Sequence, residues 1–203
     1  MPSLTLNPTI DTYIGNQAPT TNFNGIANWV GERNDSSSIR RTLIKFDLSS
    51  IPAGSTIDSV TFRLHIDNDD RSDNARTARI YRLKRGWVEG EATWDAYSTG
   101  NSWQTAGGTG ANDYDSTEIG TASYTSNEGL GYKNYAVTAS KIEEMITGGS
   151  FTNNGWLVKM DTESNDAYAH SNREGVNTAN QPELIIDYTE PVTTATAGML
   201  LLF

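Results

Sequence analysis

Hydrophobic and polar residues alternate with a period of two along much of the chain, which is the pattern of half-buried β-strands. The clearest case is the segment 57–66, where apolar side chains fall on one face and polar side chains on the other. Its apolar face consists of Val60, Phe62, Leu64 and Ile66. The segment 40–48 repeats the pattern, with Ile44, Phe46 and Leu48 on one face. A strand is therefore expected in each segment.

Short segments of the same kind recur along the rest of the chain, and each is bounded by residues that favour turns. They occupy residues 3–6, 11–14, 26–31, 76–83, 118–124, 133–137, 156–160, 167–170 and 183–188. One helix is predicted over residues 140–147, because Ser140 and Glu143 have the spacing of a capping box. Its apolar stripe consists of Ile142, Met145 and Ile146. These elements predict an all-β fold, an antiparallel jelly-roll β-sandwich with one short helix.

Chain length, net charge and cysteine content limit the number of domains and the kinds of partner that we expect. At 203 residues and 36% hydrophobic composition, the chain suffices for one core, and we expect a single sandwich domain over residues 1–189. The formal net charge of −10 repels polyanions, so nucleic acid is not an expected partner. The absence of cysteine excludes disulfides and thiolate chemistry. No segment has the roughly 18 to 20 consecutive apolar residues of a membrane span, and the start does not look like a signal peptide.

Several of these segments together resemble the DNRLRE-type domain, which is related to the family-96 carbohydrate-binding modules. The pieces that carry the resemblance are Asp11–Ile14 (DTYI), 42–48 (TLIKFDL), 80–83 (IYRL), 87–94 (WVEGEATW), 153–155 (NNG), 171–174 (SNRE) and 182–184 (PEL). They run in the family's order across residues 4–188. The resemblance implies a jelly-roll sandwich, mostly in non-catalytic modules of secreted or cell-surface proteins, some of which bind polysaccharides, and similar sandwiches occur in virus particles.

Aromatic and basic residues give two candidates for a carbohydrate surface. Trp29, Trp87, Trp94, Trp103 and Tyr97 could together form a platform for stacking on sugar rings. Trp87 and Trp94 match family positions that look structural, whereas Trp103 and Tyr97 lie in a polar loop and are the better candidates for a surface position. Six basic residues fall within fifteen positions: Arg71, Arg76, Arg79, Arg82, Lys84 and Arg85. On an acidic protein this run could dock an anionic sugar, with Arg76, Arg79 and Arg82 as its contacts. The alternative is a solvated strand edge protected by its charges.

A long irregular segment such as 96–131 is usually functional or held in place by a bound ion. Asn112, Asp113 and Asp115 concentrate hard oxygen ligands there, so this group is the candidate for a structural Ca²⁺, which the resemblance also implies. The acidic segment 67–73 has acids at three positions that match an EF-hand calcium loop. However, Arg71 stands where the loop needs an oxygen ligand, and Ser72 stands where it needs glycine. A solvated turn is the better interpretation of that segment.

Few residues of this chain are candidates for a catalytic site. Glu89 and Glu91 lie between two tryptophans and invite comparison with the carboxylate pair of a glycosidase, although the resemblance makes them structural. The two histidines, His65 and His170, have no cysteine or serine partner in a recognisable arrangement. His65 is expected to point outward from its strand, and His170 to form an ordinary hydrogen bond. An enzyme is therefore not expected.

The chain ends in a Thr/Ala-rich linker and five apolar residues, Met199, Leu200, Leu201, Leu202 and Phe203. Such a tail is too short to span a bilayer and is expected to be buried, on its own domain or in a neighbouring protein. The tail and the stand-alone domain favour a non-enzymatic structural protein of a virus particle, a capsid decoration or tail-associated subunit, docked to other virion proteins in an oligomeric assembly. The alternative is a secreted or cell-surface carbohydrate-binding module or adhesin.

Overall fold

The computed structural model describes residues 2–33, 37–68, 74–164, 166–174 and 178–192. Thirteen strands dominate the described chain: β1 (Ser3–Leu6), β2 (Ile10–Gly15), β3 (Asn28–Arg33), β4 (Ser38–Lys45), β5 (Thr56–Asn68), β6 (Arg76–Leu83), β7 (Ala96–Ser98), β8 (Asn101–Ser102), β9 (Tyr114–Tyr124), β10 (Gly131–Val137), β11 (Trp156–Met160), β12 (Ala167–His170) and β13 (Glu183–Thr189). The helix α1 spans Ala139–Glu143, and a single 3-10 turn spans Thr178–Asn180. The prediction of a mostly β, antiparallel fold with one short helix is confirmed.

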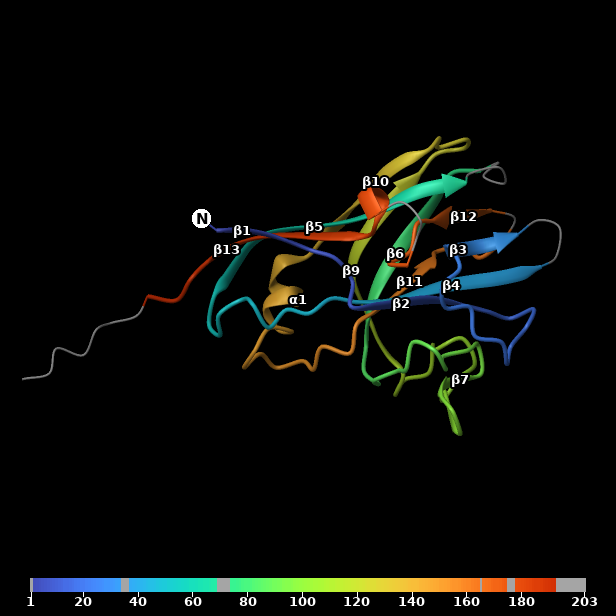
Figure 1. The fold of residues 1–203 in the computed structure, drawn as a ribbon, viewed down its shortest axis with the longest axis horizontal. Helices are drawn as coiled ribbons and strands as arrows, with labels where there is room; N and C mark the ends of the chain where they lie inside the picture. The colour runs from blue at the N-terminus through green and yellow to red at the C-terminus, as the bar shows by residue number, and fades with distance from the viewer. Residues whose placement is uncertain (1, 34–36, 69–73, 165, 175–177, 193–203) are drawn as a thin grey trace, which may run out of the picture.

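Eleven of the strands belong to one sheet, and eight of them close into a ring (Figure 1). The order around the ring is β5, β10, β9, β6, β11, β4, β3 and β12, and β12 pairs with β5 again. β13 and β1 extend from β5, and β2 pairs with β4 outside the ring order. Strands β7 and β8 form a separate two-stranded hairpin.

The ring replaces the jelly-roll sandwich of two separate sheets that the sequence predicted. The physical reason is the length of β5, which has 13 residues. On one edge its first part pairs with β13, from Thr56 to Arg63, and its end pairs with β12, at Ile66 and Asn68. On the other edge it pairs with β10. The ten residues expected from the alternation, 57–66, include Ile66 but end before Asn68, the second residue of β5 that pairs with β12.

The interior of the ring is filled by apolar side chains from nearly every strand. Four of the large aromatic side chains among them pack together: Phe46, Phe62, Tyr135 and Trp156, each at most 2% exposed. Phe62 lies at the centre of this group, with ring centroids 5.8, 5.1 and 5.5 Å from the other three rings. The alternating faces of β5 thus bury the residues that its sequence pattern assigned to the core.

A second apolar cluster lies on the outside of the ring, under the segment 84–113. Leu43 of β4 and Leu157 of β11 pair across the sheet and belong to this cluster, while their chain neighbours Ile44 and Trp156 face the interior. Figure 1 shows the segment around β7 lying beneath β2 and β11. The tryptophan-rich segment is therefore an outer layer packed on the strand wall.

Helix α1 is short, and its beginning differs from the predicted capping box. The residue at the N-cap is Thr138, and its side chain makes no capping hydrogen bond. Ser140 therefore lies inside the helix, and the first turn is held by packing: Ile142 is fully buried against the core. Within the described residues, no helix has the length and apolar character needed to cross a membrane.

Candidate functional site

The aromatic residues predicted to stack on sugar pack instead into the outer apolar cluster. Trp103 is 4% exposed, and its indole N–H donates to the Thr93 carbonyl at 3.0 Å. This burial differs from the expected surface position. Tyr97 is partly exposed, but its ring packs against Trp103 with centroids 5.6 Å apart and carries the Arg85 guanidinium 4.8 Å above its centroid. Both rings hold the segment 84–113 onto the strand wall.

The three arginines of β6 each have acidic partners. Arg76 forms an ion pair at 2.7 Å with Asp166, which is fully buried. Arg79, with about a third of its side chain exposed, bonds Glu118. The positive charges of Arg76 and Arg79 are therefore balanced within the fold, while Arg71 of the predicted basic run lies outside the described residues.

Arg82 is the most deeply buried of the three, with 4% of its side chain exposed. It pairs with Asp115 at 2.6 Å and with Glu144, and its guanidinium lies 4.0 Å above the centroid of the Phe151 ring. Arg82 thereby connects β6, β9 and the end of the helix.

The predicted calcium ligands also have other partners. Asp113 is fully buried, and its carboxylate accepts the backbone N–H groups of Gln104, Thr105 and Gly110 at 2.9 to 3.1 Å. Arg85 completes the set at 3.2 Å. Asp115 is held by Arg82, and Asn112 is exposed. The polar segment is thus organised around an Asp113 carboxylate that has its full complement of protein donors.

The carboxylates and histidines considered for catalysis have structural partners too. Glu91 accepts the backbone N–H of Thr99 at 2.8 Å. His65 lies on the outer face of β5 and bonds Asp67 at 2.7 Å, as its alternation predicted. His170 is fully buried, its Nε2 lies 3.0 Å from the Tyr124 hydroxyl, and burial lowers its pKa to about 4. A neutral, enclosed imidazole of this kind is part of the core.

Four residues from the first forty form an aromatic and cationic stack at strands β2, β3 and β4. The rings of Tyr13 and Phe23 lie nearly parallel, with centroids 4.3 Å apart. The Arg40 guanidinium lies 5.6 Å from the Tyr13 centroid and 4.6 Å from that of Trp29. Phe23, Trp29 and Arg40 are partly exposed, whereas Tyr13 is 6% exposed. We call this group the Arg40 stack.

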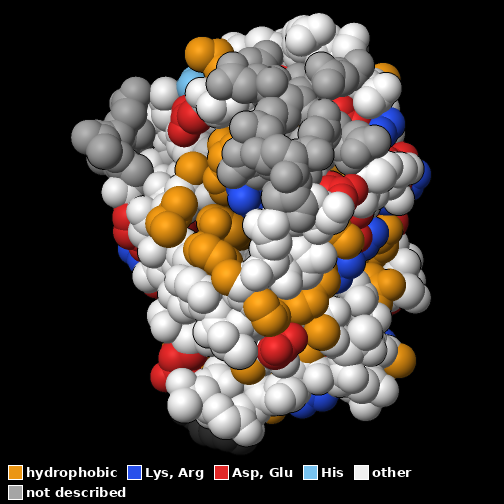
Figure 2. Space-filling view, turned by 90° about the vertical axis from the view of Figure 1, so that its right-hand side faces the viewer, with side chains coloured by type: hydrophobic (Ala, Val, Ile, Leu, Met, Phe, Trp, Pro, Cys, Tyr) orange, Lys and Arg blue, Asp and Glu red, His pale blue; other side chains and the backbone are white. Residues whose placement is uncertain are grey.

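The Arg40 stack borders a cavity of about 220 Å³. The cavity is lined by Tyr13, Gly15, Gln17, Ala18, Phe23, Ser38 and Arg40. Figure 2 views the side of the molecule toward which β3 and β4 extend in Figure 1, and hydrophobic side chains form a band across it. Partly exposed aromatic rings beside a cation and a cavity are features that a sugar ring can use for binding.

Sequence reasoning missed the Arg40 stack because its members are far apart in the sequence. They meet because β2 and β3 both pair with β4: Gly15 and Gly31 each lie opposite Arg40. The signal available was Trp29, which we had grouped with the other tryptophans. Only knowledge of the strand pairing could have separated it from them.

A second cavity, of about 550 Å³, lies between the end of β4 and the segment after helix α1. Lys45 lies on its border, and polar residues 47, 49, 147, 150, 152 and 153 line much of the rest. Phe46 lines this cavity but is 2% exposed, and Phe151 carries the Arg82 guanidinium on its ring. The cavity is less suited to stacking than the Arg40 stack.

A third group of polar residues surrounds the buried carboxylate of Asp11. Its Oδ2 accepts a hydrogen bond from the Asn28 amide at 3.0 Å and from the Arg173 backbone N–H at 2.9 Å. The Arg173 guanidinium pairs with both Glu89, at 2.9 Å, and Glu174. Burial raises the pKa of Asp11 to about 7, even though these hydrogen bonds lower it. The sequence analysis assigned no role to Asp11, although its motif carried part of the resemblance.

The comparison with known families agrees with part of the resemblance. The model of carbohydrate-binding module family 96 matches residues 2–97, slightly less than half of the 203-residue chain. The match supports a module that binds carbohydrate and is not in itself catalytic. No curated protein sequence matches the chain. The matched stretch contains the whole Arg40 stack, together with Asp11, Asn28 and Glu89.

Proposed function

We propose that this chain is a non-catalytic carbohydrate-binding module and that it holds a polysaccharide on the Arg40 stack. The observation that carries the proposal is the position of Arg40 between the rings of Tyr13 and Trp29, on an open surface within the stretch that matches family 96. The proposal moves the binding surface from the predicted Trp103, Tyr97 and β6 arginines to strands β2, β3 and β4.

The chemistry of this surface suits a sugar. The C–H face of a pyranose ring is apolar and packs against an aromatic face, while its hydroxyls need hydrogen-bond donors and acceptors at the rim. Trp29 supplies the aromatic face, and Arg40 has a planar guanidinium with N–H donors in its plane. Stacked between two rings, the guanidinium keeps a defined orientation, so less conformational entropy is lost when a sugar binds.

The test is binding of soluble polysaccharides, both neutral and uronate-bearing, by affinity electrophoresis and calorimetry. The wild-type chain should bind at least one of them, and Trp29→Ala or Arg40→Gln should weaken that binding about tenfold, equivalent to about 1.4 kcal/mol. Arg63 and Tyr132 offer a matched control. The Arg63 guanidinium lies 4.2 Å from the centroid of the Tyr132 ring, on β5 and β10. Tyr132→Ala should therefore leave the affinity unchanged.

Two outcomes would refute the proposal. If no polysaccharide retards the wild-type chain more than it retards a protein that does not bind sugar, the binding function is excluded. Binding that survives Trp29→Ala and Arg40→Gln but is lost in Tyr97→Ala or Arg79→Gln would instead return the surface to the residues first predicted.

A structural role in a virus particle is a second proposal, and it rests on the five apolar residues Met199–Phe203. These residues lie outside the described part of the chain. The proposal expects that deleting them prevents incorporation into a particle, through lost contacts with other virion proteins. Unchanged incorporation of the truncated chain would exclude that role without affecting the polysaccharide test.

A further inference from the structure

Three acidic side chains converge at the rim of the sheet. Asp11, Glu89 and Glu174 each place one carboxylate oxygen within 4.8 Å of the others. They come from β2, from the outer segment and from the chain that follows β12. Like charges at such distances destabilise one another unless a cation lies among them.

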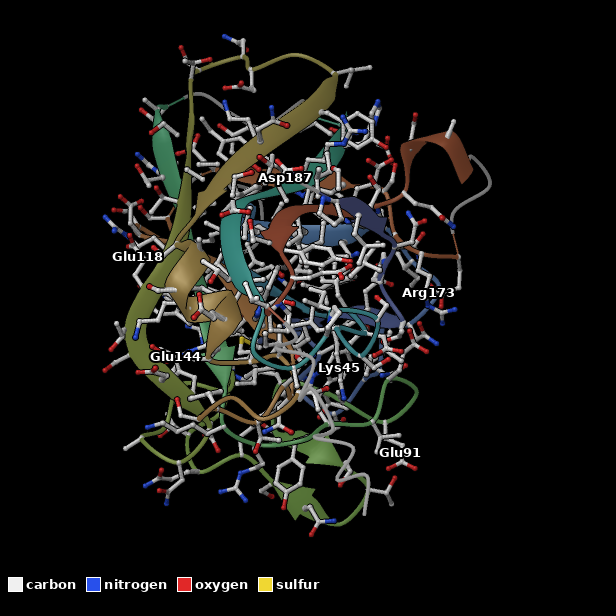
Figure 3. All side chains as sticks on the ribbon, turned by 90° about the vertical axis from the view of Figure 1, so that its left-hand side faces the viewer. Lys45, Glu91, Glu118, Glu144, Arg173 and Asp187 are labelled. Carbon is white, nitrogen blue, oxygen red and sulfur yellow. The ribbon has the colours of Figure 1, made fainter. Side chains whose placement is uncertain are left out.

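Arg173 supplies part of the required positive charge but not all of it. Its guanidinium pairs with Glu89 and Glu174, as described above, and about a third of its side chain is exposed. Figure 3 shows Arg173 at the edge of the molecule. Three carboxylates and one guanidinium leave a formal charge of −2, which a divalent cation would balance.

Two buried oxygen atoms in this group have no hydrogen-bond partner. They are Asp11 Oδ1 and Asn28 Oδ1, and both residues are fully buried. The two side chains are in contact through the bond from the Asn28 amide nitrogen to Asp11 Oδ2, at 3.0 Å. A buried acceptor that is left unsatisfied costs about 1 to 3 kcal/mol, so these two oxygens favour a ligand within the group. A cation is a ligand that would accept electron pairs from both oxygens.

We propose that Asp11, Asn28, Glu89 and Glu174 form a Ca²⁺-binding site. The donor set consists of three carboxylates and one amide carbonyl, all hard oxygen ligands, which favours Ca²⁺ over the transition metals that prefer imidazole or thiolate. The carboxylate oxygens that bond Arg173 have further lone pairs, so the ion pair and the metal can share them.

The graded exposure of the site gives an ion a way in from solvent. Asp11 is fully buried, 16% of the Glu89 side chain is exposed, and 29% of the Glu174 side chain is exposed. An ion at this site would join β2 and β3 to the outer segment and to the chain after β12. The raised pKa of Asp11 has the same origin, a buried carboxylate with too little positive charge around it. The proposal thus places the calcium site at Asp11 and not at the predicted Asp113 and Asp115.

The experiment measures Ca²⁺ binding by calorimetry on chelator-treated protein, together with the melting temperature in millimolar Ca²⁺ and in chelator. The wild-type chain should bind one Ca²⁺ and melt at a higher temperature with it, because a ligand that binds only the folded state stabilises that state. Glu174→Gln, a change at a partly exposed residue that should fold, should weaken Ca²⁺ binding about tenfold or more. Asp11→Asn should abolish the Ca²⁺-dependent melting shift if it folds.

Two variants serve as controls, Glu91→Gln in the same outer segment and Asp115→Asn at the calcium site first predicted. Both should keep the wild-type affinity for Ca²⁺. The proposal is overturned if wild-type protein shows neither heat of binding nor a melting shift, or if Asp115→Asn removes binding while Glu174→Gln retains it. Neither result depends on whether the chain binds a polysaccharide.

Discussion

His170 should make the stability of this protein fall in weakly acidic solution. The imidazole is fully buried, and burial lowers its pKa from an ordinary 6.5 to about 4. Between these two pH values the unfolded chain takes up a proton on His170 while the folded chain does not. The free energy of unfolding contributed by His170 is therefore fully present above pH 6.5 and is lost as the pH falls to about 4.

The size of the effect follows from the same two values. Each unit of pKa corresponds to about 1.4 kcal/mol, so a fall from 6.5 to about 4 amounts to about 3 kcal/mol. Asp11 acts in the opposite direction, because its raised pKa of about 7 makes the folded chain take up a proton first as the pH falls. The pH dependence of unfolding measured on the wild-type chain alone would therefore report the sum of the His170 and Asp11 effects.

Comparison with a variant separates them. Urea unfolding at several pH values between 7 and 4, in the presence of a chelator, should be measured for the wild-type chain and for His170→Gln. The variant is less stable throughout, but the difference between the two curves should shrink by about 3 kcal/mol as the pH falls. A His170→Gln curve that runs parallel to the wild-type curve would refute the reasoning.

Two further predictions concern buried charges. Arg82→Met removes the cation that pairs with Asp115 and Glu144, and since both carboxylates can reach water, the free energy of unfolding should fall by about 2 to 3 kcal/mol in urea titration. Asp113→Asn removes a carboxylate that accepts three backbone N–H groups and pairs with Arg85; the loss should be about 3 kcal/mol, with faster proteolytic cleavage in residues 99–112. Unchanged unfolding of either variant would contradict the role assigned to its residue.

Much of the fold could be predicted from the alternation of apolar and polar residues, which is clearest in β5, where buried residues alternate with more exposed ones. The strands β6, β11 and β12 have the predicted bounds, and β5 buries the apolar residues assigned to it. Closure of the ring could not be predicted. It depends on the last residues of β5, at Ile66 and Asn68, pairing with β12 far along the chain. Alternation within a segment carries no information about which strand lies beside it.

The candidate sites were harder to predict for a related reason. Trp103 and Asp113 lie in a segment rich in polar residues, which suggested a surface loop, yet both are buried because the segment folds onto the outer wall of the ring. The side chains of the Arg40 stack and of the Asp11 group come from separate segments, and each group is assembled by strand pairing. Local sequence patterns indicate secondary structure, whereas these groups depend on contacts between distant residues.

The pairing of β1 with β13 has a consequence for how this module can be joined to other proteins. Ser3 lies opposite Asp187, so the first and last strands of the described sheet leave the molecule at neighbouring points (Figure 1). A domain whose first and last strands pair in this way can be placed within a surface loop of a host protein without a long spacer. Tension applied at Ser3 and Asp187 would open the β1–β13 pair one residue at a time, starting from that end. The module is therefore suited to insertion, while its first strand is its weakest point under load.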